Sequence, residues 1–340
     1  MNIEKKPLIE MKHLLVIFTL LLLISCGSNA PSTAADCAAN TLLFTHDMLV
    51  NDAVCIPERP TRIAALDPFT FEAMVALDAP MVATSGAYMD ELLTYAPQFD
   101  EMLQSVTDSS SPVNFETLID VQPDVILCRR TACERNARRL RQIAPTVIFD
   151  NTSAADWRES ARFYAEVIGM ETEMAAIEQD YDERAAMIAA SLGDQSTTLS
   201  VMRIQPGRLR LYFERSFAGT VLAAAGFVYP DGQADEADAS RDDQGRPQLA
   251  NISEERLSLL EADYAFVYVT ENLGEDDAQA YLDELRSQSL WQSLGVVQRG
   301  DLHVVGTYWF AAGYVAAHGM LDDLSDVVLG INGEVDNPFK

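Results

Sequence analysis

The chain has 340 residues, hydrophobic residues make up 48% of it, and its formal net charge at pH 7 is -28. The apolar share is normal for a globular protein, and the length allows one large domain or two lobes. A chain this acidic is not expected to bind nucleic acid, and it is not expected to have a polybasic face for membrane binding.

The N-terminus has the pattern of an export signal. Basic residues precede an apolar run over residues 14–24, which is shorter than the roughly 20 apolar residues of a membrane-spanning helix. The tetrad Leu23-Ile24-Ser25-Cys26 resembles a bacterial lipobox, in which the peptide is cut before a cysteine that then carries lipid. We predict a signal peptide over residues 1–25, starting at Met1 or at Met11, and an extracytoplasmic protein anchored to the membrane by lipid on Cys26. The alternative is an ordinary signal peptide with an incidental cysteine.

Strand and helix patterns alternate after a small, polar tether over residues 26–39. Four short apolar runs are expected to form buried parallel strands, at residues 62–66, 81–84, 124–127 and 146–149. Amphipathic stretches between them predict helices at residues 70–77, 115–120 and 134–143. Such alternation is typical of an α/β sheet.

A long helical region follows. One helix is predicted to start near Ser153 and to end near Gly169, and a second spans residues 171–192 with apolar residues at helical spacing. At about 1.5 Å per residue, the second helix is roughly 30 Å long, which is enough to link two lobes.

The alternation then restarts. Strands are expected at residues 199–204, 208–213, 264–269 and 302–305. Helices are expected at residues 219–225, 253–260, 278–285 and 311–329, and the acidic stretch 231–243 is expected to be a loop. The layout is therefore α/β, long helix, α/β.

Four cysteines remain once Cys26 is assigned to lipid. In an exported chain they allow two disulfides with three connectivities, of which we choose the local pairs Cys37–Cys55 and Cys128–Cys133. Free buried thiols are the alternative. There is no CxxC pair and the histidines are scattered, so neither a direct metal site nor a cofactor is predicted. The chain also lacks a GxSxG motif and a Gly-rich phosphate loop, which argues against an enzyme.

Several motifs resemble, in order, the substrate-binding proteins of the iron-siderophore and cobalamin import family. They are Pro60-Thr-Arg-Ile-Ala-Ala-Leu66, Thr70-Phe-Glu-Ala-Met-Val-Ala-Leu77, Gln122-Pro-Asp-Val-Ile-Leu127, Ile143-Ala-Pro-Thr146, Ile252-Ser-Glu-Glu-Arg-Leu257, Trp291-Gln-Ser-Leu294 and Val297-Gln-Arg-Gly-Asp-Leu-His-Val304. The resemblance implies two Rossmann-like lobes with parallel sheets, joined by a single rigid helix. We place the lobes at residues 40–170 and 193–340, on either side of the helix at 171–192. The resemblance also implies a ligand cleft between the lobes. It further implies that a membrane permease and an ATPase are partners of this protein, which we expect to be a monomer.

Arginines and aromatic residues stand where strands end, and ligands of open α/β sheets bind beyond the carboxyl ends of strands. The candidates for ligand binding are Arg129, Arg130, Arg203, Tyr88, Tyr212, Tyr308 and Trp309. Guanidinium groups pair with carboxylate or catecholate oxygens, and aromatic faces cover apolar ligand surface. An acidic body would repel an anionic ligand, so a local focus of arginines is needed to attract it. The alternatives are structural ion pairs for the arginines and core packing for Trp309.

Glu72 matches an acid that family members use to dock on permease arginines. The corresponding position of the second lobe has Thr220, which departs from a symmetric two-acid pattern. We predict a lipoprotein that captures a ferric siderophore and delivers it to an import permease. Cobalamin or heme are the alternative ligands, and a non-catalytic surface interaction protein is the alternative class.

Overall fold

In the computed structural model, the described residues are 37–50, 53–85, 104–107, 114–150, 153–193, 196–270, 278–330 and 337–339. By its internal contacts the chain divides into two units, residues 1–39 and residues 40–340. The fold described below is that of the second unit. The predicted signal peptide, Cys26, most of the tether and Tyr88 lie outside the described residues. Among the helices that are described, none is long and apolar enough to cross a bilayer.

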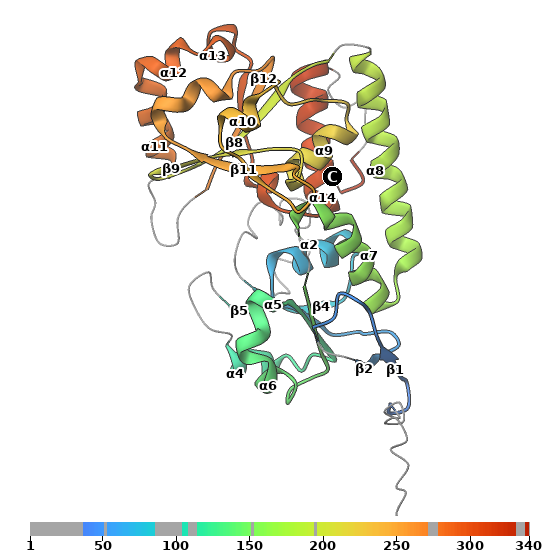
Figure 1. The fold of residues 1–340 in the computed structure, drawn as a ribbon. Helices are drawn as coiled ribbons and strands as arrows, with labels where there is room; N and C mark the ends of the chain where they lie inside the picture. The colour runs from blue at the N-terminus through green and yellow to red at the C-terminus, as the bar shows by residue number, and fades with distance from the viewer. Residues whose placement is uncertain are drawn as a thin grey trace, which may run out of the picture. The chain divides into compact units, whose positions relative to one another are not determined.

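The first half of the unit is built on a parallel sheet with strand order β5-β4-β3-β6-β7. Figure 1 labels β4 and β5 of this sheet together with the helices α2, α4, α5 and α6. Its strands are β3 (Ile63–Ala65), β4 (Met81–Ser85), β5 (Gln104–Thr107), β6 (Val125–Arg129) and β7 (Thr146–Phe149). Its helices are α2 (Pro68–Ala76), α4 (Phe115–Asp120), α5 (Arg130–Cys133), η2 (Glu134–Asn136) and α6 (Ala137–Leu140). β1 (Thr41–Phe44) and β2 (Val54–Pro57) form a separate antiparallel pair. The strand β5 was not predicted, and the helix expected at 134–143 is divided into shorter turns.

The start of α2 shows why the chain turns from strand to helix after β3. Pro68 occupies the first turn, and the side chain of Asp67 accepts hydrogen bonds from the backbone N–H groups of Phe69 and Thr70. The helix is buried on almost every side, with all residues from Thr70 to Ala76 buried. A helix that is buried all round must pack against several other elements.

Two helices connect the halves. α7 (Trp157–Ile168) follows the short turn η3 (Ala154–Asp156) and ends at Gly169. α8 (Glu171–Leu192) has 22 residues, so it is about 33 Å long, and it contacts α7, α9 and α14. Its bounds coincide with those expected from the apolar stripe.

The second half contains a six-stranded sheet with order β10-β11-β9-β8-β12-β13. Its strands are β8 (Leu199–Gln205), β9 (Arg208–Tyr212), β10 (Ser240–Arg241), β11 (Pro247–Ile252), β12 (Tyr264–Val269) and β13 (Leu302–Val305). The accompanying helical elements are α9 (Phe217–Ala224), α10 (Gln233–Glu236), η4 (Glu254–Leu260), α11 (Ala278–Ser287), α12 (Ser289–Ser293), α13 (Gly295–Arg299), η5 (Thr307–Phe310), α14 (Tyr314–Asp323) and η6 (Leu324–Leu329).

This second sheet is mixed, which corrects the expectation of purely parallel sheets. β8, β12 and β13 are parallel, but β9 runs antiparallel to β8, with Gln205 opposite Arg208. Only Pro206 and Gly207 connect these two strands, and Gly207 has a φ of 69°. So short a connection permits only an antiparallel hairpin. The acidic stretch expected to be a loop also contains α10 and β10.

Candidate functional site

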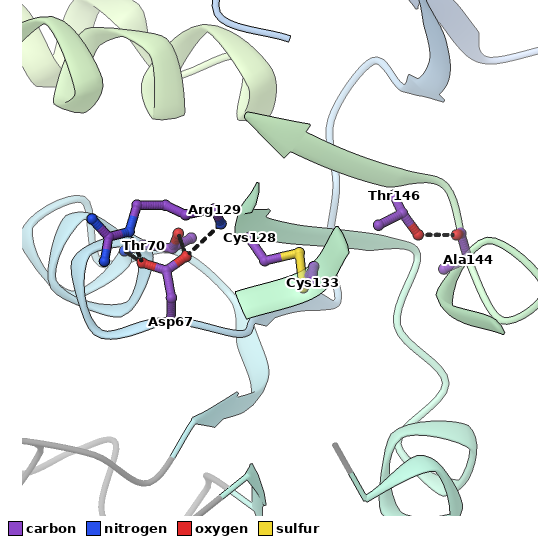
Figure 2. The surroundings of a disulfide bond; sticks show 7 residues. All are labelled: Asp67, Thr70, Cys128, Arg129, Cys133, Ala144 and Thr146. Carbon is purple, nitrogen blue, oxygen red and sulfur yellow. Dashed lines mark hydrogen bonds and ion pairs between the residues drawn. A yellow bond between two sulfur atoms is a disulfide. The ribbon is translucent and has the colours of Figure 1, made fainter. Parts of the chain in front are cut away.

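On the first sheet, Arg129 ends β6 and is held by the N-cap of α2. Its backbone N–H donates to Asp67 Oδ2 at 3.0 Å, and its Nε lies 3.5 Å from Asp67 Oδ1. Its guanidinium carbon lies 3.9 Å from the centroid of the Phe69 ring. Figure 2 shows the Arg129 side chain beside Asp67 and Thr70. Because Asp67 pairs with it, Arg129 is a partly compensated cation stacked on an aromatic ring.

Arg130 begins α5, and its Nε forms an ion pair with Asp150 Oδ2 at 3.0 Å, with both side chains substantially exposed. An exposed ion pair contributes little to stability, and this geometry agrees with the structural alternative for Arg130. The other arginines of the run, at positions 135, 138, 139 and 141, are exposed.

A disulfide closes the loop just after β6. Cys128 and Cys133 are bonded, with Cα atoms 6.1 Å apart, and both residues are buried (Figure 2). The bond fixes the chain next to Arg129 and Arg130. Cys37 and Cys55 are each in disulfide form. Their pairing with one another stays a prediction.

On the second sheet, Arg203 is almost fully buried, with 6% of its surface exposed. Its Nε donates to Thr270 Oγ1 at 2.6 Å, and its guanidinium carbon lies 4.2 Å from the centroid of the Phe310 ring. In the sheet register, Arg203 lies opposite Arg210 of β9 and Tyr268 of β12. Residues that are directly opposite project from the same face of a sheet. The three side chains therefore share one face.

Arg210 is the second cation of this face. Its Nε donates to Asn251 Oδ1 at 3.1 Å. Within the described part of the chain, neither Arg203 nor Arg210 forms an ion pair with a carboxylate. Two adjacent guanidinium groups without an acidic partner are unusual in a chain of net charge -28, and they make a favourable place for an anion.

A cavity of about 250 Å³ lies between residues of the first half and residues of the second. Its lining is mainly apolar and aromatic and comprises Phe69, Ser153, Ala154, Tyr212, Arg215, Ser216, Phe217, Ala218, Gln248, Leu249, Tyr268, Trp309 and Phe310. Phe69 stacks with Arg129, and Phe310 stacks with Arg203. On each side of the cavity, an arginine therefore contacts an aromatic residue of the lining. Arg215 also lines it, but Asp156 and Asp242 balance its charge.

The predicted aromatic residues have different environments. Tyr212 lines the cavity, and its ring centroid lies 6.1 Å from that of Tyr268. Trp309 also lines it but is only 1% exposed, and its Nε1 donates to Asp323 Oδ2 at 2.7 Å. The hydroxyl of Tyr308 donates to the same oxygen at 2.5 Å. Burial raises the pKa of Asp323, although both donors oppose the shift. Tyr308 and Trp309 therefore hold the turn that places Phe310.

The docking role predicted for Glu72 is wrong in this structure. The side chain is 1% exposed, and its Oε1 accepts a hydrogen bond from the backbone N–H of Ala316 at 3.1 Å. A carboxylate enclosed in this way cannot reach a permease. Thr220, the position expected to match it, accepts a hydrogen bond from Trp157 Nε1 at 2.9 Å. Burial of α2 on nearly all sides is the physical reason for the difference.

Sequence reasoning missed Arg210, Tyr268 and Phe69. The signal for Arg210 was present, because the hairpin at Pro206 and Gly207 fixes the register that puts Arg210 beside Arg203. Phe69 could not be found, since its contact with Arg129 depends on how α2 packs. Among the residues that the structure describes, no group of three or more histidine, cysteine or acidic side chains suits a metal ion.

A family model described as periplasmic binding protein matches residues 63–306. The chain belongs to this family. The predicted family and the predicted α/β fold are thereby confirmed. A probable siderophore-binding lipoprotein of Bacillus subtilis, YfiY, is 29% identical over 329 residues, which cover 94% of this chain and 98% of that protein. An achromobactin-binding periplasmic protein of Dickeya dadantii is 27% identical and covers 65% of this chain and 71% of its own length.

Solved structures share the fold. Staphylococcus aureus SirA complexed with staphyloferrin B superposes with a TM-score of 0.68 at 21% identity, covering 85% of this chain and 99% of that one. The siderophore periplasmic binding protein from the fuscachelin gene cluster of Thermobifida fusca has a TM-score of 0.64 at 26% identity, covering 81% and 98%. The two-lobed architecture expected from the sequence agrees with these neighbours.

Proposed function

We propose that this protein binds an anionic ferric siderophore in the cavity between its two halves and delivers it to an import permease driven by an ATPase. The pair of guanidinium groups at Arg203 and Arg210, without an acidic partner in the described residues, carries the proposal. Ferric complexes of carboxylate or catecholate siderophores are commonly anionic and have flat, partly apolar surfaces. Arginines would pair with their oxygens, and Phe69, Tyr212, Tyr268 and Phe310 would cover the rest.

Relatives support this proposal. The similar proteins of Bacillus subtilis and Dickeya dadantii are named for siderophore or achromobactin binding, and the SirA structure contains staphyloferrin B. The proposed role requires no catalysis by the protein. It places Arg129, Arg203, Tyr212 and Trp309 at the ligand site, with Arg210, Tyr268, Phe69 and Phe310 added from the geometry. Tyr88, Arg130 and Tyr308 remain proposals from the sequence alone.

We also propose that the mature protein is a monomer held outside the cytoplasm by lipid on Cys26. The lipobox pattern and the lipoprotein names of relatives support this. Replacement of Cys26 by Ser tests it, because the variant should be released from the membrane fraction and should lose the mass of the lipid.

Quenching of intrinsic tryptophan fluorescence tests which ligand binds, because Trp309 lines the cavity. A suitable panel contains ferric staphyloferrin B, ferric achromobactin, ferric citrate, a ferric catecholate, an uncharged ferric hydroxamate, cobalamin and heme. The proposal predicts saturable quenching by anionic ferric complexes, together with a thermal shift that grows with ligand concentration. Binding of cobalamin or heme alone would favour the alternative ligands. Silence across the panel would refute a receptor function and favour a surface interaction protein.

A further inference from the structure

The buried carboxylate of Glu72 lies at the first turn of α14. Its Oε1 accepts a hydrogen bond from Ala316 N–H at 3.1 Å, and the backbone N–H groups of Val315 and Tyr314 also hydrogen-bond to it. These are the first three residues of α14. The N–H groups of a helix's first turn have no partner within the helix and need an acceptor from elsewhere. Glu72 supplies that acceptor from a position 244 residues before Ala316.

Gly313, the N-cap residue of α14, makes room for this contact. It has no side chain that could cap the helix, and its backbone is extended, with a φ of -175°. Any residue can adopt this backbone conformation, so the conformational freedom of glycine does not explain why position 313 has a glycine. A Cβ atom at this position would instead overlap the carboxylate of Glu72. Glu72 and Gly313 therefore form a matched pair, in which one residue caps the helix and the other leaves space for the cap.

This contact joins the two sides of the cavity. α2 follows β3 of the first sheet and carries Phe69, which lines the cavity beside Arg129. α14 follows the turn with Trp309 and Phe310, and its last residue, Asp323, binds Trp309. Each helix thus bears one wall of the cavity, and Glu72 connects the helices directly.

We infer that Glu72 is a positioning residue, whose carboxyl oxygens cap α14 across the two halves and thereby set Phe69 and Arg129 opposite Phe310 and Arg203. Other contacts also cross between the halves, including the hydrogen bond from Trp157 to Thr220 and the ion pair of Arg215 with Asp156. Glu72 differs from them because it satisfies several buried backbone donors at once. Its effect on ligand affinity rests on the proposed function, whereas its role as a cap does not.

Hydrogen exchange at the amides of Tyr314, Val315 and Ala316 measures the cap directly, in the full protein without ligand. Glu72→Ala should speed their exchange about 10-fold or more, as expected when a helix loses its capping acceptor. Glu72→Gln should give a smaller increase, because an amide keeps one acceptor oxygen. Glu173→Gln, at an exposed position of α8, and Thr220→Val, which removes another hydrogen bond between the halves, are the controls and should leave these amides unchanged.

A double-mutant cycle tests the pairing with Gly313. Gly313→Ala alone should destabilise the fold through overlap with the carboxylate, and much of that loss should disappear in the Glu72→Ala background. This comparison keeps the inference testable if one single variant folds poorly. Additive effects would show that the two residues do not share the space.

Affinity for ferric staphyloferrin B and ferric citrate completes the test. Glu72→Ala should weaken binding by about 10-fold or more, as expected when a preorganised site loses its alignment, while Glu173→Gln should bind like the wild type. Unchanged exchange and unchanged affinity in Glu72→Ala would overturn the inference, as would equal acceleration of exchange in Thr220→Val. If wild-type protein binds neither probe, the proposed function fails for them, and the exchange experiment still decides whether Glu72 caps α14.

Discussion

Replacement of Arg203 by Met should weaken binding of an anionic ferric siderophore without loss of stability. Arg203 uses Nε to bind Thr270, and within the described residues its two terminal nitrogens have no protein partner. A hydrogen bond to a charged group contributes about 1.5–3 kcal/mol, so losing one to the ligand corresponds to an increase in Kd of about 10- to 150-fold. Met retains the length and the apolar contact with Phe310.

Stability should respond differently from affinity. A buried guanidinium without a carboxylate is costly to desolvate, so an apolar side chain in its place is expected to leave the free energy of unfolding unchanged or to raise it. Calorimetric titration with ferric staphyloferrin B measures the affinity, and denaturant unfolding measures the stability. The exposed Arg286→Met is the matched control and should change neither. Unchanged affinity in Arg203→Met, or an equal loss for an uncharged ferric hydroxamate, would refute this reasoning.

Three further predictions concern residues around the site. Burial raises the pKa of Glu72 from 4.5 to about 7, so ionisation of this enclosed carboxyl group costs stability, although the backbone hydrogen bonds that it accepts oppose the shift. Relative to Glu72→Gln, the wild type should therefore lose about 3 kcal/mol of unfolding free energy as the pH rises from 4.5 through 7, and parallel pH profiles would contradict this. Replacing Cys128 and Cys133 by Ser should lower the free energy of unfolding by about 2 kcal/mol, as the loop-entropy relation gives for so short a loop. Denaturant unfolding measures this loss, and equal midpoints for the variant and the wild type would contradict the prediction. Arg210→Met should reduce affinity for the anionic complex about 10-fold and lessen the dependence of association rate on salt, whereas an unchanged rate at low salt would exclude a role for Arg210 in attracting the ligand.

The sequence was informative where local patterns decide the structure. Short apolar runs predicted β3, β4, β6 and β7 because a strand covered on both faces has few polar residues. The apolar stripe of residues 171–192 gave the bounds of α8. The run Asp124-Val-Ile-Leu-Cys128 also placed Arg129 correctly at the end of a strand.

The failures arose where packing decides. Glu72 has the charge of a surface residue, and only the approach of α14 to α2 shows that its carboxylate is enclosed. Trp309 and Tyr308 were assigned to the ligand from their position after a strand, and only the fold shows that their polar atoms bind Asp323 while Trp309 also lines the cavity. Arg203 and Arg210 lie side by side because the two turn residues between β8 and β9 set the register of these strands. The sequence had been interpreted as giving parallel sheets, so this antiparallel pairing of β9 was not expected.

In the function that we propose, the arginines of the second sheet hold an anionic ferric complex in the cavity. Equilibrium dialysis against radioactive iron as ferric staphyloferrin B tests it most directly, with wild-type protein and the variant carrying both Arg203→Met and Arg210→Met. Each wild-type molecule should retain one iron with its chelator, and the folded double variant should retain little or none. Equal retention by the two proteins, or retention of iron without the chelator, would contradict it.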